Sequence, residues 1–195
     1  MYKLLATAVV LGGGLYLSAC ATLNESECQT VDWKQLGDSD GSQGHGQTRI
    51  AQHSKACEKH GIAVNTAAYN DGWRAGISRY CTPQNGFNIG RRGGSYARTC
   101  PSELAGPFEA AYRPAYKLNR AENRVGEIQS GIDKSIDNLA RWAISKNPKL
   151  IAKIPEERRH LNNLRAEQPI ARSNVEIARR ELQDYLAVNP QIQAR

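Results

Sequence analysis

Cysteine is the residue type with the clearest chemistry in this sequence of 195 residues, which contains five of them. Cys28, Cys57, Cys81 and Cys100 form one group, and no cysteine follows Cys100. An even number of cysteines favours disulfides in a protein of an oxidising compartment. The N-terminal residues predict export to such a compartment. Four cysteines allow three pairings, and the sequence does not decide among them. We expect the two sequential pairs, each worth about 3 kcal/mol of stability.

Metal binding is the alternative chemistry for part of this group. His53, Cys57 and His60 are spaced so that a helix would place them on one face, and Cys28 would complete a Cys₂His₂ zinc site. Exported thiols tend to pair with one another, and the sequence has no Cys-x₂-Cys knuckle. We therefore expect no metal and no other cofactor.

The fifth cysteine, Cys20, ends a segment with the pattern of a secretory signal peptide. One positive charge, Lys3, precedes an apolar run from Leu4 to Leu17, and small residues follow. The run of about 14 residues is shorter than the roughly 20 that a transmembrane helix needs. An ordinary signal peptide with a chance cysteine is one interpretation of this segment.

The alternative that we favour is a lipoprotein signal, because residues 17–20, Leu-Ser-Ala-Cys, resemble a bacterial lipobox. That resemblance implies that residues 1–19 are cleaved and that the Cys20 thiol carries acyl chains such as palmitate. Residues 20–27 would then form a lipidated tether. Because Ala21 rather than aspartate follows the cysteine, the resemblance also implies transport to the outer membrane, with the protein on the periplasmic face.

Aromatic residues between positions 28 and 100 are the candidate binding residues. Rings with nearby acids suit stacking on a glycan, and the candidates are Trp33, Asp40, Tyr69, Trp73 and Tyr96. The alternative is that these rings form the core, since few other large apolar residues are available.

Catalysis has little support in the sequence. Neither a Ser-x-x-Lys motif nor a His-Glu-x-x-His motif occurs in the sequence. His45 with Asp40 is conceivable as an acid–base pair on spacing alone. We therefore expect no catalytic residue and no enzyme.

Short helices are expected to position these side chains. Asp32 predicts the cap of a helix that ends at Gly37, followed by a turn-rich loop over 38–46. Residues 48–60 predict a second helix, and Asn65 predicts the cap of a third that runs to about Tyr80. For residues 82–100 we expect an irregular loop or a short hairpin. Gly72 and Gly76 have the small-xxx-small spacing that lets another backbone approach closely.

Several short motifs follow one another in residues 28–102: Asp-Trp, Asp-Gly, Tyr-x-x-Gly-Trp-x-x-Gly, Tyr-Cys, Gly-Phe-x-x-Gly-x-x-Gly and Tyr-x₃-Cys-Pro. With the lipobox, this ordered series resembles a family of proteobacterial lipoproteins that share a domain of unknown function, DUF2799. The doubled Arg91-Arg92 and Gly93-Gly94 are a small departure. The resemblance implies an envelope lipoprotein, and it carries no established activity.

Residues 103–195 have a different character, with no cysteine and with apolar residues that recur every three, four or seven positions. The pattern predicts helices over about 107–146 and 155–188, and the second has the heptad-like register of a coiled coil. Their narrow apolar stripes and short connection favour an antiparallel hairpin. Contact of the hairpin with a partner or a second copy is an alternative that can coexist with it.

The expected fold is mainly α, with a small disulfide-stapled, helical and loop-rich domain over 28–102 and a long two-helix antiparallel hairpin over 103–195. The net charge is +7 without a block of five or six like charges, so we expect no nucleic-acid partner. The expected function is that of an outer-membrane lipoprotein of non-enzymatic, binding or structural type. Its expected partners are the membrane through Cys20, an envelope protein or a second copy through the hairpin, and peptidoglycan. A glycan-binding module or envelope enzyme that uses the aromatic candidates is the alternative.

Overall fold

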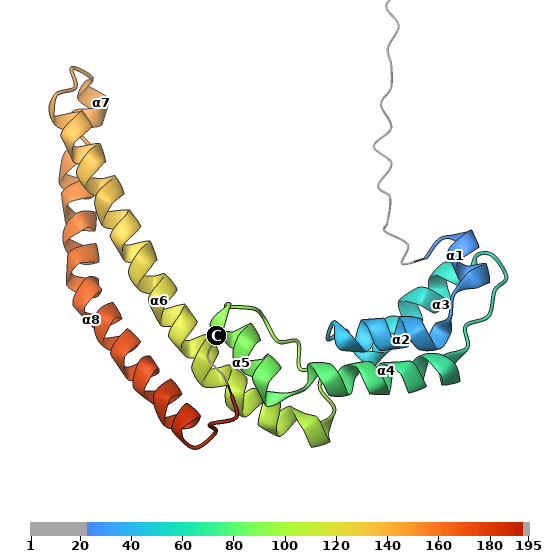
Figure 1. Cartoon of the computed structure of the whole chain (residues 1–195). Coiled ribbons are helices and arrows are strands. Elements are labelled where there is room, and N and C mark those ends of the chain that lie inside the picture. The colour runs from blue at the N-terminus through green and yellow to red at the C-terminus, as the bar shows by residue number, and fades with distance from the viewer. Residues whose placement is uncertain (1–22, 193–195) are drawn as a thin grey trace, which may run out of the picture.

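Figure 1 shows the computed structural model of the chain, which describes residues 23–192. The described part consists of helices joined by turns, so the prediction of a mainly α fold is confirmed. The elements are α1 (Glu25–Thr30), α2 (Trp33–Ser42), the 3₁₀ helix η1 (Gln47–Arg49), α3 (Ile50–Glu58), α4 (Thr66–Tyr80), α5 (Pro83–Arg91), α6 (Ser102–Ala143), α7 (Pro148–Ile151) and α8 (Ile154–Ala187). The predicted signal peptide and Cys20 lie outside the described residues.

The helices form two arms that meet at α5 (Figure 1). In one arm α2 packs along α4, with α1 and α3 beside them. In the other arm α6 and α8 form the predicted antiparallel hairpin, with α7 at its far end. Helix α5 packs on the first half of α6 and so joins the arms.

Two of the predicted helix starts are confirmed by their capping hydrogen bonds. The Asp32 carboxylate accepts from the backbone N–H groups of Lys34 and Gln35 at 2.9 and 3.0 Å. The Asn65 side chain accepts from the N–H of Ala68 at 3.0 Å. Each side chain satisfies donors that the first helical turn leaves without a partner.

The predicted end of α2 at Gly37 is wrong, because the helix continues through the expected loop to Ser42. Gly37 and Gly41 lie against α4, where a Cβ on Gly41 would be 2.5 Å from the carbonyl oxygen of Trp73. Reciprocally, Cβ atoms on Gly72 and Gly76 would overlap the backbone of α2. The expected close approach at Gly72 and Gly76 is confirmed, and the two helices pack backbone to backbone through glycines four residues apart.

The loop or hairpin predicted over residues 82–100 is wrong for its first half, which is α5. Thr82 caps this helix by accepting from the N–H of Asn85 at 3.2 Å, and Pro83 suits its first turn. Gly86, which lies in the predicted loop or hairpin, instead faces α6, as does Gly90 one turn later. A Cβ on Gly90 would lie 2.5 Å from the carbonyl oxygen of Tyr112.

Both expected disulfides are confirmed. Cys28–Cys57 joins α1 to α3, with an S–S distance of 2.00 Å. Cys81–Cys100 joins the end of α4 to the segment before α6, with an S–S distance of 2.07 Å. The sulfur atoms of Cys28 and Cys57 are bonded to each other and are therefore not free to bind zinc. Among residues 23–192, no group of three histidine, cysteine or acidic side chains is placed to hold a metal ion.

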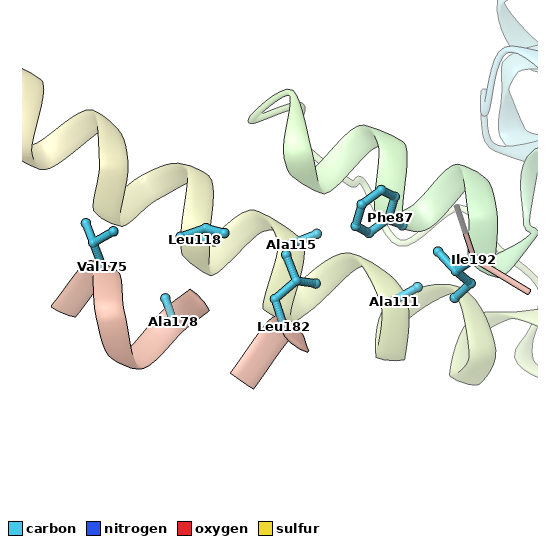
Figure 2. Close-up of a cluster of buried hydrophobic side chains, with 8 residues drawn as sticks. All are labelled: Phe87, Ala111, Ala115, Leu118, Val175, Ala178, Leu182 and Ile192. Atoms are coloured by element: carbon cyan, nitrogen blue, oxygen red, sulfur yellow. The ribbon is translucent and has the colours of Figure 1, made fainter. Parts of the chain in front are cut away.

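The hairpin begins earlier than predicted, since α6 starts at Ser102 rather than near residue 107. Its first half contributes to two hydrophobic clusters. In one, Phe108 packs with Tyr69, Trp73 and Ile77 of α4. The other joins α5, α6, α8 and the segment after α8, as Figure 2 shows. Its members are Phe87, Ala111, Ala115, Leu118, Val175, Ala178, Leu182 and Ile192.

The distal half of the hairpin has a smaller core, formed by Ile128, Ile132, Leu161 and Ala171. Both long helices bend along their length (Figure 1), and both contain interior prolines, Pro107 and Pro114 in α6 and Pro169 in α8. A proline inside a helix removes one backbone hydrogen bond and favours such bending. None of the helices between residues 23 and 192 combines the length and the hydropathy needed to cross a membrane.

Candidate functional site: the Asp40 cluster and the Trp73 cavity

A buried polar cluster lies where α2, η1, α3 and α4 meet. Asp40 of α2 is its centre: its carboxylate is 2.8 Å from Nε2 of His53 and 2.7 Å from the hydroxyl of Tyr69. The Nε atom of Arg49 lies 3.4 Å from the other carboxylate oxygen and completes an ion pair. A single acid thus connects four consecutive elements of one arm.

The carboxylate is held in its ionised form. Burial by itself raises the pKa of Asp40, but hydrogen bonds with His53 and Tyr69, together with the positive charge of Arg49, outweigh burial and lower it below its ordinary value. Burial and the bond to Asp40 raise the pKa of the Tyr69 phenol. At neutral pH the phenol and the His53 Nε2–H therefore both donate to a charged acceptor.

Asp40, His53 and Tyr69 are closed to solvent, whereas Arg49 is partly exposed. Asp40 is 5% exposed, His53 is buried, and Tyr69 has no exposed surface. A substrate cannot reach the imidazole or the carboxylate in this arrangement. The cluster instead satisfies a buried charge and fixes how the surrounding helices pack.

His53 and Arg49 are the members that the sequence analysis did not join to Asp40. The pairing of His45 with Asp40 is wrong, because the imidazole beside the carboxylate belongs to His53. His45 makes backbone contacts instead: its N–H donates to the Asp40 carbonyl at 2.9 Å, and its carbonyl accepts from the Trp73 indole at 2.8 Å. The burial of His53 had a signal in the sequence, because His53 lies one helical turn before Cys57, which is buried, and shares its helix face.

The five candidate binding residues do not form one site. Tyr69 and Trp73 are buried in the core of the first arm, where Tyr69 also bonds Asp40. Trp33 is half-buried against the same core. Tyr96 lies on the α6 side, with its ring centroid 4.6 Å from that of Phe108. Since Tyr69 is fully buried, its ring has no face available for stacking on a sugar.

Trp73 also lines an open cavity of about 600 Å³ between the two arms. Its walls come from three segments: Gly46, Gln47, Thr48, Trp73, Arg74, Ala97, Arg98, Thr99, Pro101 and Glu103. Arg98 has a φ of 56°, a left-handed conformation that is uncommon outside glycine. The hydroxyl of Thr99 is buried without a hydrogen-bond partner among the described residues. The lining of the cavity therefore includes a tryptophan, two arginines and an acid.

Comparison with known proteins identifies a family for this part of the molecule. No curated protein and no solved structure matches the chain significantly. A family model described as "Protein of unknown function (DUF2799)" matches residues 32–117. The match starts at the Asp32 cap and ends within α6, so it includes the Asp40 cluster, the Trp73 cavity and the packing of α5 on α6. Residues 32–117 thus match the family that the ordered motifs of residues 28–102 indicated, and we call them the DUF2799 region.

Proposed function

We propose that this protein is a lipid-anchored envelope protein of binding or structural type, in which the α6–α8 hairpin is the arm that contacts a partner. Cys20 would hold the chain at the periplasmic face of the outer membrane. The lipobox-like sequence and the two disulfides support this location, since disulfides persist in oxidising compartments.

One observation carries the role of the hairpin: it extends past the DUF2799 region with apolar side chains facing outward. Ile170 of α8 is 64% exposed, and Ile136 and Ile177 are also exposed. Two paired helices can bury only the stripes that face each other, so these side chains have no cover within the hairpin. Ile170 and Ile177 are seven residues apart on α8 and therefore share one exposed face, which supports a contact surface for an envelope protein or a second copy.

The Asp40 cluster supports the non-enzymatic part of the proposal. It contains the acid and imidazole that an acid–base mechanism would use, but both are buried and bonded to each other. A general base must come within hydrogen-bond reach of the proton it removes, which this burial prevents.

Site-specific photo-crosslinking in cells tests the proposal. A photoreactive amino acid replaces Ile177 in the full chain, and the matched control carries it at Lys59, an exposed residue just after α3. We expect a defined protein adduct from position 177 but not from position 59. We also expect the Ile177 adduct in the membrane fraction, and Cys20→Ser should move the protein to the soluble fraction. The same adducts from both positions, or none from position 177, would reject the partner-binding arm. Membrane retention of the Cys20→Ser protein would reject the anchor.

A further inference from the structure

The far end of the hairpin combines exposed apolar side chains with positive charge. We call residues 141–153 the hairpin tip; they comprise the end of α6 and its connection to α8, which includes α7. Ile144 is 86% exposed, the largest value among the exposed isoleucines, and Ile151 is 47% exposed. Trp142 and Leu150 are half-buried beside them. Removing large apolar groups such as these from water lowers the free energy, so they favour contact with another molecule or surface.

The charges of the tip have one sign. Arg141, Lys146, Lys149 and Lys153 fall within it, and no acid occurs between Asp137 and Glu156. Arg141 is neutralised by Asp137 at 3.1 Å. The three lysines make no ion pair with any residue between 23 and 192. The tip therefore presents three unneutralised ammonium groups next to two exposed isoleucines.

This composition distinguishes between two kinds of partner. Protein–protein interfaces are depleted in lysine, because ammonium groups are costly to dehydrate. A lipid headgroup layer leaves lysines hydrated while it attracts them, and it accepts isoleucine and tryptophan side chains in the adjacent apolar zone. We propose that the hairpin tip binds an anionic phospholipid surface, with Ile144 and Ile151 in the interface and the lysines at the phosphates.

The position of the tip suits such a contact. In Figure 1, α7 and α1 are at the ends of the two arms, and both arms rise on the same side of the α4–α5 line. A chain anchored ahead of α1, as the proposed function has it, would present α7 toward that same side. The inference rests on the proposed function only for the presence of a membrane, because the lipid contact itself is a property of the tip.

Vesicle flotation with the chain from residue 21 onward tests the inference, since this form includes every described residue and lacks Cys20. We expect binding to vesicles of phosphatidylglycerol and phosphatidylcholine, weakening as salt rises, and little binding to pure phosphatidylcholine. Each lysine near an anionic surface contributes about fivefold, so K146Q/K149Q/K153Q should weaken binding on the order of 100-fold. I144S/I151S should weaken it by about tenfold or more.

The matched control is K34Q/K55Q/K59Q, which removes the same charge from exposed lysines of the other arm. Circular dichroism checks that all variants remain folded. Equal weakening in both triple-lysine variants, or no binding of the unmodified chain to anionic vesicles, overturns the inference. Adducts from Ile177 in cells without vesicle binding reject the lipid contact and leave the partner-binding arm standing. Vesicle binding without adducts from Ile177 rejects the partner-binding arm and leaves the lipid contact standing.

Discussion

At the scale of single residues, Asp40 is the most consequential side chain of the first arm. A charge removed from water lowers stability unless its partners replace the lost hydration. Asp40 has three such partners, on η1, α3 and α4. If any of these elements moved away, the Asp40 carboxylate would lose one of its partners. The cluster therefore specifies the packing of these helices as well as stabilising it.

This arrangement makes stability depend on acid pH. The pKa of Asp40 is lowered in the folded chain from an ordinary value of 3.8. A carboxylate with a lowered pKa contributes its full stabilisation at pH values above the ordinary pKa. That stabilisation is lost as the pH falls through the pKa of the folded state. We expect the free energy of unfolding, measured by urea denaturation, to fall less between about pH 5 and pH 2 in Asp40→Asn than in the unmodified protein.

Near neutral pH the same variant should be less stable by about 2–3 kcal/mol, because neutral hydrogen bonds replace charge-assisted ones. Asp71→Asn is the control, since Asp71 is an exposed carboxylate of α4. It should follow the pH dependence of the unmodified protein. An Asp40→Asn profile that also matches the unmodified protein would show that Asp40 does not titrate below its ordinary range.

The cluster also marks a limit of sequence reasoning at this scale. Caps at Asp32 and Asn65 were predictable because each bonds a backbone group within three residues. His53 and Tyr69 lie 13 and 29 residues from Asp40. Their meeting depends on how three helices pack. The sequence indicates that His53 shares a helix face with Cys57, but it does not indicate that this face meets Asp40.

At the scale of elements, glycine spacing explains both where prediction succeeded and where it failed. Gly72 and Gly76 were expected to meet another backbone, and they do. Gly37 was predicted to end a helix and Gly86 to lie in a loop or hairpin, although both make the same kind of backbone contact, on α2 and α5. A glycine that ends a helix and one that packs a helix look alike locally. The distinguishing signal was a second glycine four residues later on each helix, Gly41 and Gly90.

Two glycine substitutions separate these roles. Gly72→Ala places a Cβ on the backbone of α2, so we expect the overpacking to lower the free energy of unfolding by about 1–3 kcal/mol. Gly126→Ala, in an exposed part of α6 with nothing within 4 Å of the added Cβ, should raise it by about 0.5–1 kcal/mol through helix propensity. Thermal and urea unfolding measure both. Stabilisation by Gly72→Ala would contradict the close contact between α2 and α4.

At the scale of the whole molecule, α6 belongs to both arms. Its first half contributes Phe108 to the cluster with α4, and Ala111, Ala115 and Leu118 to the cluster with α5 and α8. Asn119 and Glu122 of α6 still bond Arg91 at the end of α5, and the more distal part of α6 packs along α8 and, at the tip, on α7. The disulfides lie within the first arm and before α6, so they do not restrain the distal hairpin. The composition change after residue 102 predicted two regions, but it could not reveal that the first turns of α6 would be covered by α4 and α5.

This distribution of contacts predicts a gradient of local opening along the hairpin. Regions with few buried apolar contacts open at a lower cost than the global unfolding free energy. We expect amide hydrogen exchange, followed by mass spectrometry, to be slowest in residues 105–118 and faster toward residues 144–153. Ile132→Ala, in the distal cluster, should lower local stability by about 2–5 kcal/mol and speed exchange only within residues 126–168.

Phe87→Ala provides the contrast, because Phe87 is buried where α5, α6 and α8 meet. It should speed exchange in both arms, since it weakens the cluster through which α5 joins them (Figure 2). If Ile132→Ala instead speeds exchange equally in α2 and α4, the chain opens as one cooperative unit and the hairpin has no separate stability. A change confined to the distal hairpin would mean that this arm can bend or open at a partner or a membrane surface while the DUF2799 region stays folded.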